Sequence, residues 1–212
     1  MGMKIKICGL SRDCDIRFVN EALPDYAGFI LMFPGSRRNV FLETAAALRK
    51  QLNPAIRAVG VFVDRTEEEV LTAADYVGVD VIQLHGHESE TYIRSLKEKT
   101  SRPIWKAFRV RTKDDVREAA ESQADAILLD NGYGTGESFD WTLLAGLSRP
   151  FYLAGGLTPE TICEAERLLK PELVDISSGV ETDGYKDRRK IMKAIQAAHE
   201  VNTEHLSIRG EK

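Results

Sequence analysis

Short runs of aliphatic and β-branched residues alternate along this chain with longer segments in which apolar residues recur every three or four positions. Continuous apolar runs are typical of strands in a parallel sheet, and the longer segments are typical of amphipathic helices that cover such a sheet. The predicted strands are Lys4–Ile7, Tyr26–Met32, Ala58–Val63, Val81–Leu84, Ile104–Phe108, Ala126–Leu129, Phe151–Leu153 and Val174–Ser177. The predicted helices are Cys14–Ala22, Leu42–Leu52, Glu67–Val77, Glu90–Lys97, Lys113–Ser122, Trp141–Leu147, Pro159–Leu169 and Arg188–Val201.

These successive strand–helix units predict a single α/β domain, an eight-stranded parallel (β/α)8 TIM barrel. Strands joined through helices pair in parallel with right-handed crossovers, and eight is the number at which such a sheet closes. The chain of 212 residues fits one such barrel, and an open doubly wound sheet is the alternative architecture. We expect a catalytic barrel domain over residues 1–201 and a polar, disordered tail over residues 202–212.

Composition and charge argue against two classes of partner, membranes and nucleic acids. No apolar run approaches the roughly 20 residues that cross a bilayer, and the N-terminus lacks a signal-peptide core, so we expect a cytoplasmic protein without a membrane partner. The formal net charge of −4 provides no general basic field, which argues against nucleic acid as the main partner. An anionic ligand would need a local cluster of donors.

The end of the first strand carries a candidate catalytic thiol. Cys8 lies where a barrel places its chemistry, and strand alternation puts it on the same face as Lys6. A thiol there is a candidate base or nucleophile, and the nearby ammonium would favour the thiolate; a packed, inert cysteine is the alternative. Lys6 could instead pair with an interior acid such as Asp175, because a buried lysine needs a partner.

Asp130 directly follows the apolar run of the sixth predicted strand. A carboxyl group in that position is a candidate acid or base, with a pKa that burial could raise. The alternative is a loop aspartate, since Asn131 and Gly132 form a turn signal. The glycine-rich segment at residues 132–136 could close over a ligand.

Two loops predict a phosphate site. The seventh strand runs into Gly155 and Gly156, and the eighth runs into Ser178 and Gly179. Glycines let backbone N–H groups approach a ligand closely, hydroxyl groups add donors, and these two loops commonly bind phosphate in barrels.

Two arginines, Arg37 and Arg38, lie in the loop after the second strand. A loop arginine is usually a solvated charge. One of these could instead bind a substrate carboxylate with two parallel hydrogen bonds.

Two histidines, His85 and His87, follow the fourth strand and raise the question of a metal. Gly86 between them interrupts the strand, and the other histidines of the chain lie near its C-terminus, so a third histidine ligand is hard to find. A hydrogen-bonding role for His85 in the pocket is the better interpretation.

Taken together, these motifs resemble the phosphoribosylanthranilate isomerases of tryptophan biosynthesis. The matching segments follow the family's order over nearly the whole chain: Lys6-Ile7-Cys8-Gly9-Leu10, Gly60-Val61-Phe62-Val63, Gln83-Leu84-His85-Gly86, Leu128-Leu129-Asp130 with Gly134-Thr135-Gly136, Phe139-Asp140-Trp141, Ala154-Gly155-Gly156-Leu157 and Asp175-Ile176-Ser177-Ser178-Gly179-Val180-Glu181.

The resemblance implies an Amadori rearrangement of N-(5-phosphoribosyl)anthranilate, a small phosphorylated aminosugar, without cofactor or metal. It implies that Asp130 is the general acid that opens the furanose ring and that Cys8 is the general base that removes the C2 proton. It also implies that Arg38 holds the anthranilate carboxylate. The remaining expected contacts are Gln83, His85 and Asp175 to the substrate, and Gly155, Gly156, Ser178 and Gly179 to its phosphate.

One position departs from the family pattern. The family usually has proline before the loop arginine, whereas Arg37 stands there in this chain, so the choice between Arg37 and Arg38 stays open, with Arg38 favoured by register. Two other functions remain: an isomerase for a different phosphorylated aminoaldose, such as those of histidine biosynthesis, and a non-catalytic barrel that binds a phosphorylated metabolite. We expect a monomer or a homodimer.

Overall fold

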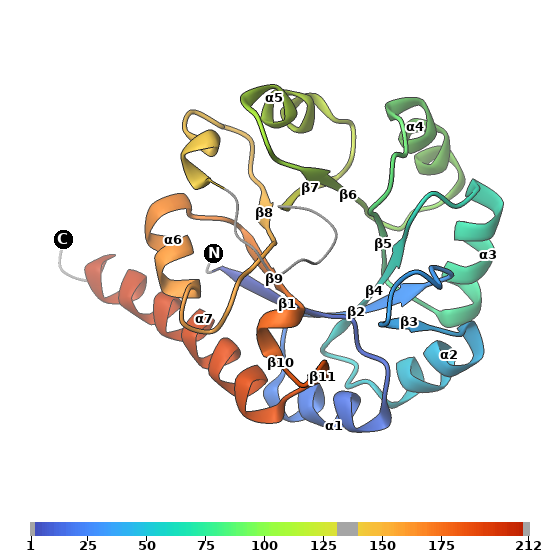
Figure 1. Ribbon diagram of the computed structural model, residues 1–212, viewed down its shortest axis with the longest axis horizontal. Helices are drawn as coiled ribbons and strands as arrows, with labels where there is room; N and C mark the ends of the chain where they lie inside the picture. Colours follow the sequence, from blue (N-terminus) through green and yellow to red (C-terminus); the bar gives the residue numbers. More distant parts are fainter. Residues whose placement is uncertain (1–2, 131–139, 210–212) are drawn as a thin grey trace.

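The computed structural model describes residues 3–130 and 140–209, with side chains up to His199, and its strands close into a parallel barrel ringed by helices (Figure 1). The barrel strands are β1 (Lys4–Cys8), β2 (Tyr26–Leu31), β4 (Arg57–Phe62), β5 (Val81–Leu84), β6 (Ile104–Arg109), β7 (Ala126–Asp130), β8 (Tyr152–Leu153) and β9 (Leu173–Ile176). Because β1 pairs in parallel with both β2 and β9, the sheet is closed. The predicted (β/α)8 barrel is therefore confirmed, and the open doubly wound sheet is wrong.

Three short strands were not predicted. β3 (Asn39–Val40) pairs with the end of β2, while β10 (Glu181–Thr182) and β11 (Tyr185–Lys186) form a small antiparallel hairpin after β9. A 3₁₀ turn, η2 (Ser178–Val180), connects β9 to this hairpin. Strands of two residues carry no hydrophobic period that a sequence could reveal.

The helices follow the predicted order: α1 (Asp13–Ala22), α2 (Leu42–Gln51), α3 (Glu67–Val77), α4 (Glu90–Lys99), α5 (Lys113–Glu121), α6 (Ile162–Leu169) and α7 (Arg188–Arg209). The predicted helix over Trp141–Leu147 is instead a 3₁₀ helix, η1 (Trp141–Leu144). The predicted start of α6 at Pro159 is also wrong, because a turn from Thr158 to Thr161 precedes the helix. The backbone of α7 stays helical to Arg209, past the predicted end at Val201, so it overlaps the expected tail, and the division into domain and tail stays a prediction.

Two apolar layers hold the barrel together. The larger layer lies between the outer face of the sheet and the helices, and the smaller one lies inside the barrel. In the amino-terminal half of the interior, the ring of Trp105 packs edge-on against those of Tyr26 and Tyr152, with centroids 4.9 and 4.8 Å away. Toward the carboxyl ends of the strands, several interior positions carry small residues, with Gly28 and Ala154 among them. The aromatic side chains thus fill one half of the barrel, and the other half has room for a site.

We expect the substitution Trp105→Ala to lower the free energy of unfolding by about 3–5 kcal/mol, because it empties a well-packed interior position. Trp105→Phe keeps an aromatic ring there and should cost clearly less. Urea denaturation followed by far-ultraviolet circular dichroism measures both variants. Equal losses, or a loss below about 1 kcal/mol for Trp105→Ala, would show that the aromatic cluster does not support the barrel.

Candidate active site

A cavity of about 480 Å³ opens at the carboxyl ends of the barrel strands. All but one of the predicted site residues line it: Cys8, Arg38, Gln83, His85, Asp130, Gly155, Gly156, Asp175 and Ser178. These residues come from distant parts of the chain, and the closed barrel brings them to one place because parallel strands end on the same side.

Cys8 and Lys6 lie on the inner face of β1, as predicted. Lys6 is completely buried, and its Nζ lies 2.7 Å from Oδ2 of Asp175 on the neighbouring strand β9. Gly28 of β2 faces this pair: a Cβ built there would lie 2.9 Å from Sγ of Cys8 and 3.0 Å from Cε of Lys6. A side chain at position 28 would therefore displace one of them.

Burial raises the pKa of the Cys8 thiol, although the ammonium group of Lys6 acts in the opposite sense. The expectation that Lys6 favours the thiolate is correct in direction. However, burial outweighs it, and the carboxylate of Asp175 also opposes ionisation of the thiol. The thiol of the free protein is therefore protonated at neutral pH.

Gln83, His85 and Asp130 form a chain of polar contacts across the cavity. Nε2 of Gln83 lies 3.1 Å from Nδ1 of His85, and Nε2 of His85 lies 3.3 Å from Oδ2 of Asp130. If the amide of Gln83 donates to Nδ1, the imidazole carries its proton on Nε2 and donates it to the carboxylate. His87 contacts Asp64 instead, with its Nδ1 3.1 Å from Oδ2 of that aspartate.

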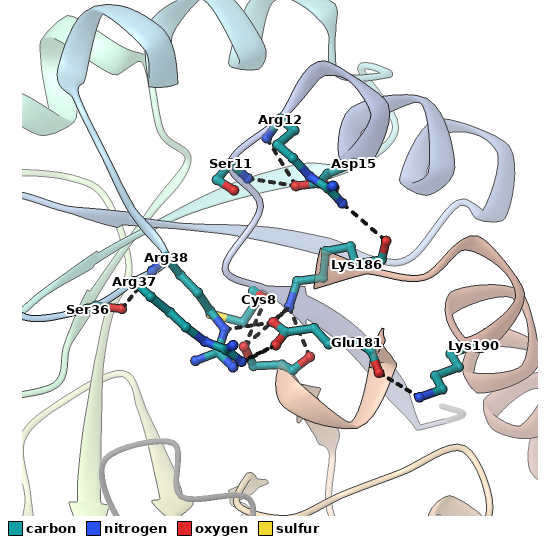
Figure 2. A network of polar contacts seen from close by, with 11 residues as sticks. Cys8, Ser11, Arg12, Asp15, Ser36, Arg37, Arg38, Glu181, Lys186 and Lys190 are labelled. Atoms are coloured by element: carbon teal, nitrogen blue, oxygen red, sulfur yellow. Dashed lines mark hydrogen bonds and ion pairs between the residues drawn. The ribbon is translucent and has the colours of Figure 1, made fainter. Parts of the chain in front are cut away.

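Glu181, which the sequence did not single out, lies beside this cavity and binds two arginines that line it (Figure 2). Its carboxylate accepts two hydrogen bonds from Arg38, from Nε at 2.7 Å and from Nη2 at 2.9 Å. Arg37 donates to it at 2.6 Å and Lys186 at 2.7 Å. Burial alone would raise the pKa of Glu181. The hydrogen bond from Arg38 and the charge of Lys186 outweigh burial and hold this pKa below its ordinary value.

The two arginines differ in their surroundings. The side chain of Arg38 is 13% exposed and that of Arg37 is 58% exposed, although both line the cavity. A Cβ at Gly9 would lie 2.5 Å from Cδ of Arg38, so the absence of a side chain at Gly9 lets Arg38 lie across the end of β1, near Cys8.

The two loops predicted to bind phosphate meet at the cavity. Gly155 and Gly156 have left-handed φ angles of 85° and 66°, which glycine adopts readily. Gly179 does not line the cavity: a Cβ there would lie 1.9 Å from the carbonyl oxygen of Leu157, so this glycine allows the two loops to pack together. Its contact with phosphate stays a prediction.

No helix in the described part of the chain is long and apolar enough to cross a membrane. The glycine-rich segment at residues 132–136, which could close over a ligand, lies outside the described residues.

Comparisons with known proteins agree with this arrangement. A family model described as N-(5'-phosphoribosyl)anthranilate (PRA) isomerase matches residues 5–197. Proteins named N-(5'-phosphoribosyl)anthranilate isomerase are similar to this chain: that of Endomicrobium trichonymphae is 45% identical, covering 91% of this chain and 96% of the relative. That of Caldanaerobacter subterraneus subsp. tengcongensis is 43% identical, covering 94% of this chain and 99% of the relative.

Solved structures give the same result. The phosphoribosyl anthranilate isomerase of Thermotoga maritima superposes with a TM-score of 0.86 at 34% identity, covering 93% of this chain and 99% of the other. A phosphoribosyl anthranilate isomerase in complex with reduced 1-(o-carboxyphenylamino)-1-deoxyribulose 5-phosphate superposes with a TM-score of 0.83, also at 34% identity, with the same coverage. With the family model spanning most of the chain and relatives matched over nearly their full length, this chain belongs to the phosphoribosylanthranilate isomerase family.

Proposed function

We propose that this protein catalyses the rearrangement of N-(5'-phosphoribosyl)anthranilate to 1-(2-carboxyphenylamino)-1-deoxyribulose 5-phosphate, a step of tryptophan biosynthesis. The observation that carries the proposal is one cavity that brings together a thiol, a carboxyl group, two arginines and two glycine-containing loops. These groups match the needs of the substrate, which has two protons to be moved, a carboxylate and a phosphate. The names of the relatives and the ligand of the solved complex support this reaction.

Asp130 and Cys8 are the proposed acid and base. Asp130 protonates the furanose ring oxygen, the C1–O bond breaks, and the aniline nitrogen takes up the positive charge as an iminium ion. Cys8, acting as thiolate, then removes the C2 proton, which gives an enolamine that tautomerises to the ketone. His85 supports this assignment, because its Nε2 lies 3.3 Å from Asp130 and can donate to the carboxylate that forms. Apart from the cleavage of the C1–O bond, these steps transfer protons, and the proposed mechanism uses no cofactor or metal.

The aromatic end of the substrate fits the side of the cavity where Arg38 lies. Glu181 occupies the Nε–Nη2 edge of this guanidinium, which leaves Nη1 and the second proton of Nη2 for a substrate carboxylate. Ile30, Phe33 and Val61 line the same cavity and offer apolar contacts to the anthranilate ring. At the other end, Gly155, Gly156 and Ser178 are the proposed phosphate ligands, with Gly179 behind them.

Two buried oxygens are suited to the sugar hydroxyl groups. Within the described part of the chain, Oε1 of Gln83 and Oδ1 of Asp175 have no hydrogen-bond partner. Both residues line the cavity. A buried acceptor without a partner is costly, and hydroxyl donors from a bound sugar would satisfy both.

The proposed reaction is that of a small-molecule biosynthetic enzyme, and we infer that it takes place in the cytoplasm. A related structure is described as that of monomers generated from the dimeric isomerase of Thermotoga maritima. For this chain, a monomer or a homodimer stays the prediction.

We expect Cys8→Ser and Asp130→Asn each to lower kcat/KM by about 10²- to 10⁴-fold, because each removes one proton-transfer group. Turnover is measured by the loss of anthranilate fluorescence, with the exposed Cys163→Ser as the matched control that keeps full activity. Unchanged rates in either variant would contradict its role. A folded wild-type protein without turnover would favour a different aminoaldose substrate or a non-catalytic barrel.

Arg38→Lys should raise KM about 10- to 100-fold. The planar guanidinium of arginine can bind Glu181 along one edge and the substrate carboxylate along another, whereas the compact ammonium of lysine cannot. Arg37→Lys should change KM by less than about 3-fold, because Arg37 is more exposed and donates only one hydrogen bond to Glu181. Steady-state kinetics on both variants makes the comparison. A larger effect at Arg37 would assign the carboxylate to that residue.

A further inference from the structure

Charged side chains from several elements act on the thiol of Cys8. Lys6 lies on the same strand, Asp175 on β9, Lys186 on β11 and Arg38 in the loop between β2 and β3. Gly28 of the facing strand β2 adds no charge. Arg38 and Lys186 are paired with the carboxylate of Glu181, and Lys6 is paired with that of Asp175.

Lys6 lies beside both Cys8 and Asp175. Its Nζ donates to Oδ2 of Asp175 at 2.7 Å. The side chains of Lys6 and Cys8 lie next to each other, since both come within 3.0 Å of the position that a Cβ of Gly28 would occupy. An ammonium group has three donors, so one lysine can serve a thiolate and a carboxylate together. The two acceptors then compete for one buried positive charge.

The second oxygen of Asp175 connects this pair to the ligand cavity. Oδ1 is buried without a hydrogen-bond partner among the described residues, and Asp175 lines the cavity. A donor from a bound molecule that hydrogen-bonds Oδ1 would leave Oδ2 to Lys6. Such a bond withdraws negative charge from Asp175. This weakens the ion pair between Asp175 and Lys6 and also the repulsion between Asp175 and a thiolate at Cys8.

We propose that Lys6 is a positioning residue shared by Cys8 and Asp175, and that a sugar hydroxyl bound to Asp175 shifts it toward Cys8. This inference rests on the proposed function, because it makes Cys8 the base of that reaction. In the empty site the thiol keeps its proton, which protects it from alkylation and oxidation. When the sugar binds, Lys6 stabilises the thiolate that removes the C2 proton.

The ionisation of Cys8 can be followed directly by NMR of the protein labelled with ¹³C at the cysteine β-carbon. Cys14→Ser and Cys163→Ser leave Cys8 as the single thiol. In this background, Asp175→Asn should lower the midpoint of the Cys8 titration by about one pH unit or more, and Lys6→Met should raise it by a similar amount. Lys6→Arg keeps the charge and should stay closer to the parent protein.

Shifts of opposite sign in Asp175→Asn and Lys6→Met are the result that a merely structural role would not produce. Shifts of the same sign, or none, would overturn the proposal. If Lys6→Met does not fold, the double variant Lys6→Met/Asp175→Asn is used in its place. The double variant removes both charges of the pair and so leaves neither of them buried without its partner. Its midpoint should lie above that of Asp175→Asn alone, and an equal midpoint would overturn the role of Lys6.

The ligand-dependent step is tested by adding reduced 1-(o-carboxyphenylamino)-1-deoxyribulose 5-phosphate to the same labelled protein. The Cys8 midpoint should fall in the parent protein and stay unchanged in Asp175→Asn. A fall of equal size in both would overturn the link through Asp175. If this ligand does not bind, the proposed function fails, whereas the titrations without ligand still decide the arrangement of Lys6 and Asp175.

Discussion

The pairing of β1 with both β2 and β9 is the constraint on which the rest of this structure depends. It closes the sheet, and its register sets Lys6 beside Asp175 on one side and Cys8 beside Gly28 on the other. Since a shift of one residue would turn β1 inside out, the same hydrogen bonds that hold the barrel together also keep the lysine and the thiol inside it. The strand pairing that closes the barrel therefore also places the side chains of β1 in the site.

The interior of the barrel divides into a structural half and a chemical half. Trp105, Tyr26 and Tyr152 fill the amino-terminal half with apolar surface. The other half contains the buried ion pair of Lys6 with Asp175, and beyond the strand ends the carboxylate of Glu181 pairs with Arg38 and Lys186. Such groups contribute little net stability, because the cost of removing them from water offsets their attraction. Their value lies in holding an ammonium and a guanidinium at fixed places around one cavity.

Much of this arrangement could be predicted from the sequence, because both the barrel and its site follow from local patterns. The helix predicted over residues 67–77 coincides with α3, and Cys8 and Asp130 were identified as strand-end residues that face the mouth. Glu181 could not be identified in that way, since a glutamate after a strand is usually solvated. Its burial depends on Arg38, 143 residues earlier in the chain. The raised pKa of Cys8 also depends on three-dimensional burial that alternation along one strand does not reveal.

We propose that one cavity binds both anionic ends of the substrate while Cys8 and Asp130 act between them. The most direct test is a crystal structure of this protein with reduced 1-(o-carboxyphenylamino)-1-deoxyribulose 5-phosphate. We expect the carboxylate on the free edge of Arg38, the phosphate at Gly155, Gly156 and Ser178, and the sugar carbons between Cys8 and Asp130. A phosphate bound away from these loops, or a sugar out of reach of Cys8, would contradict this proposal.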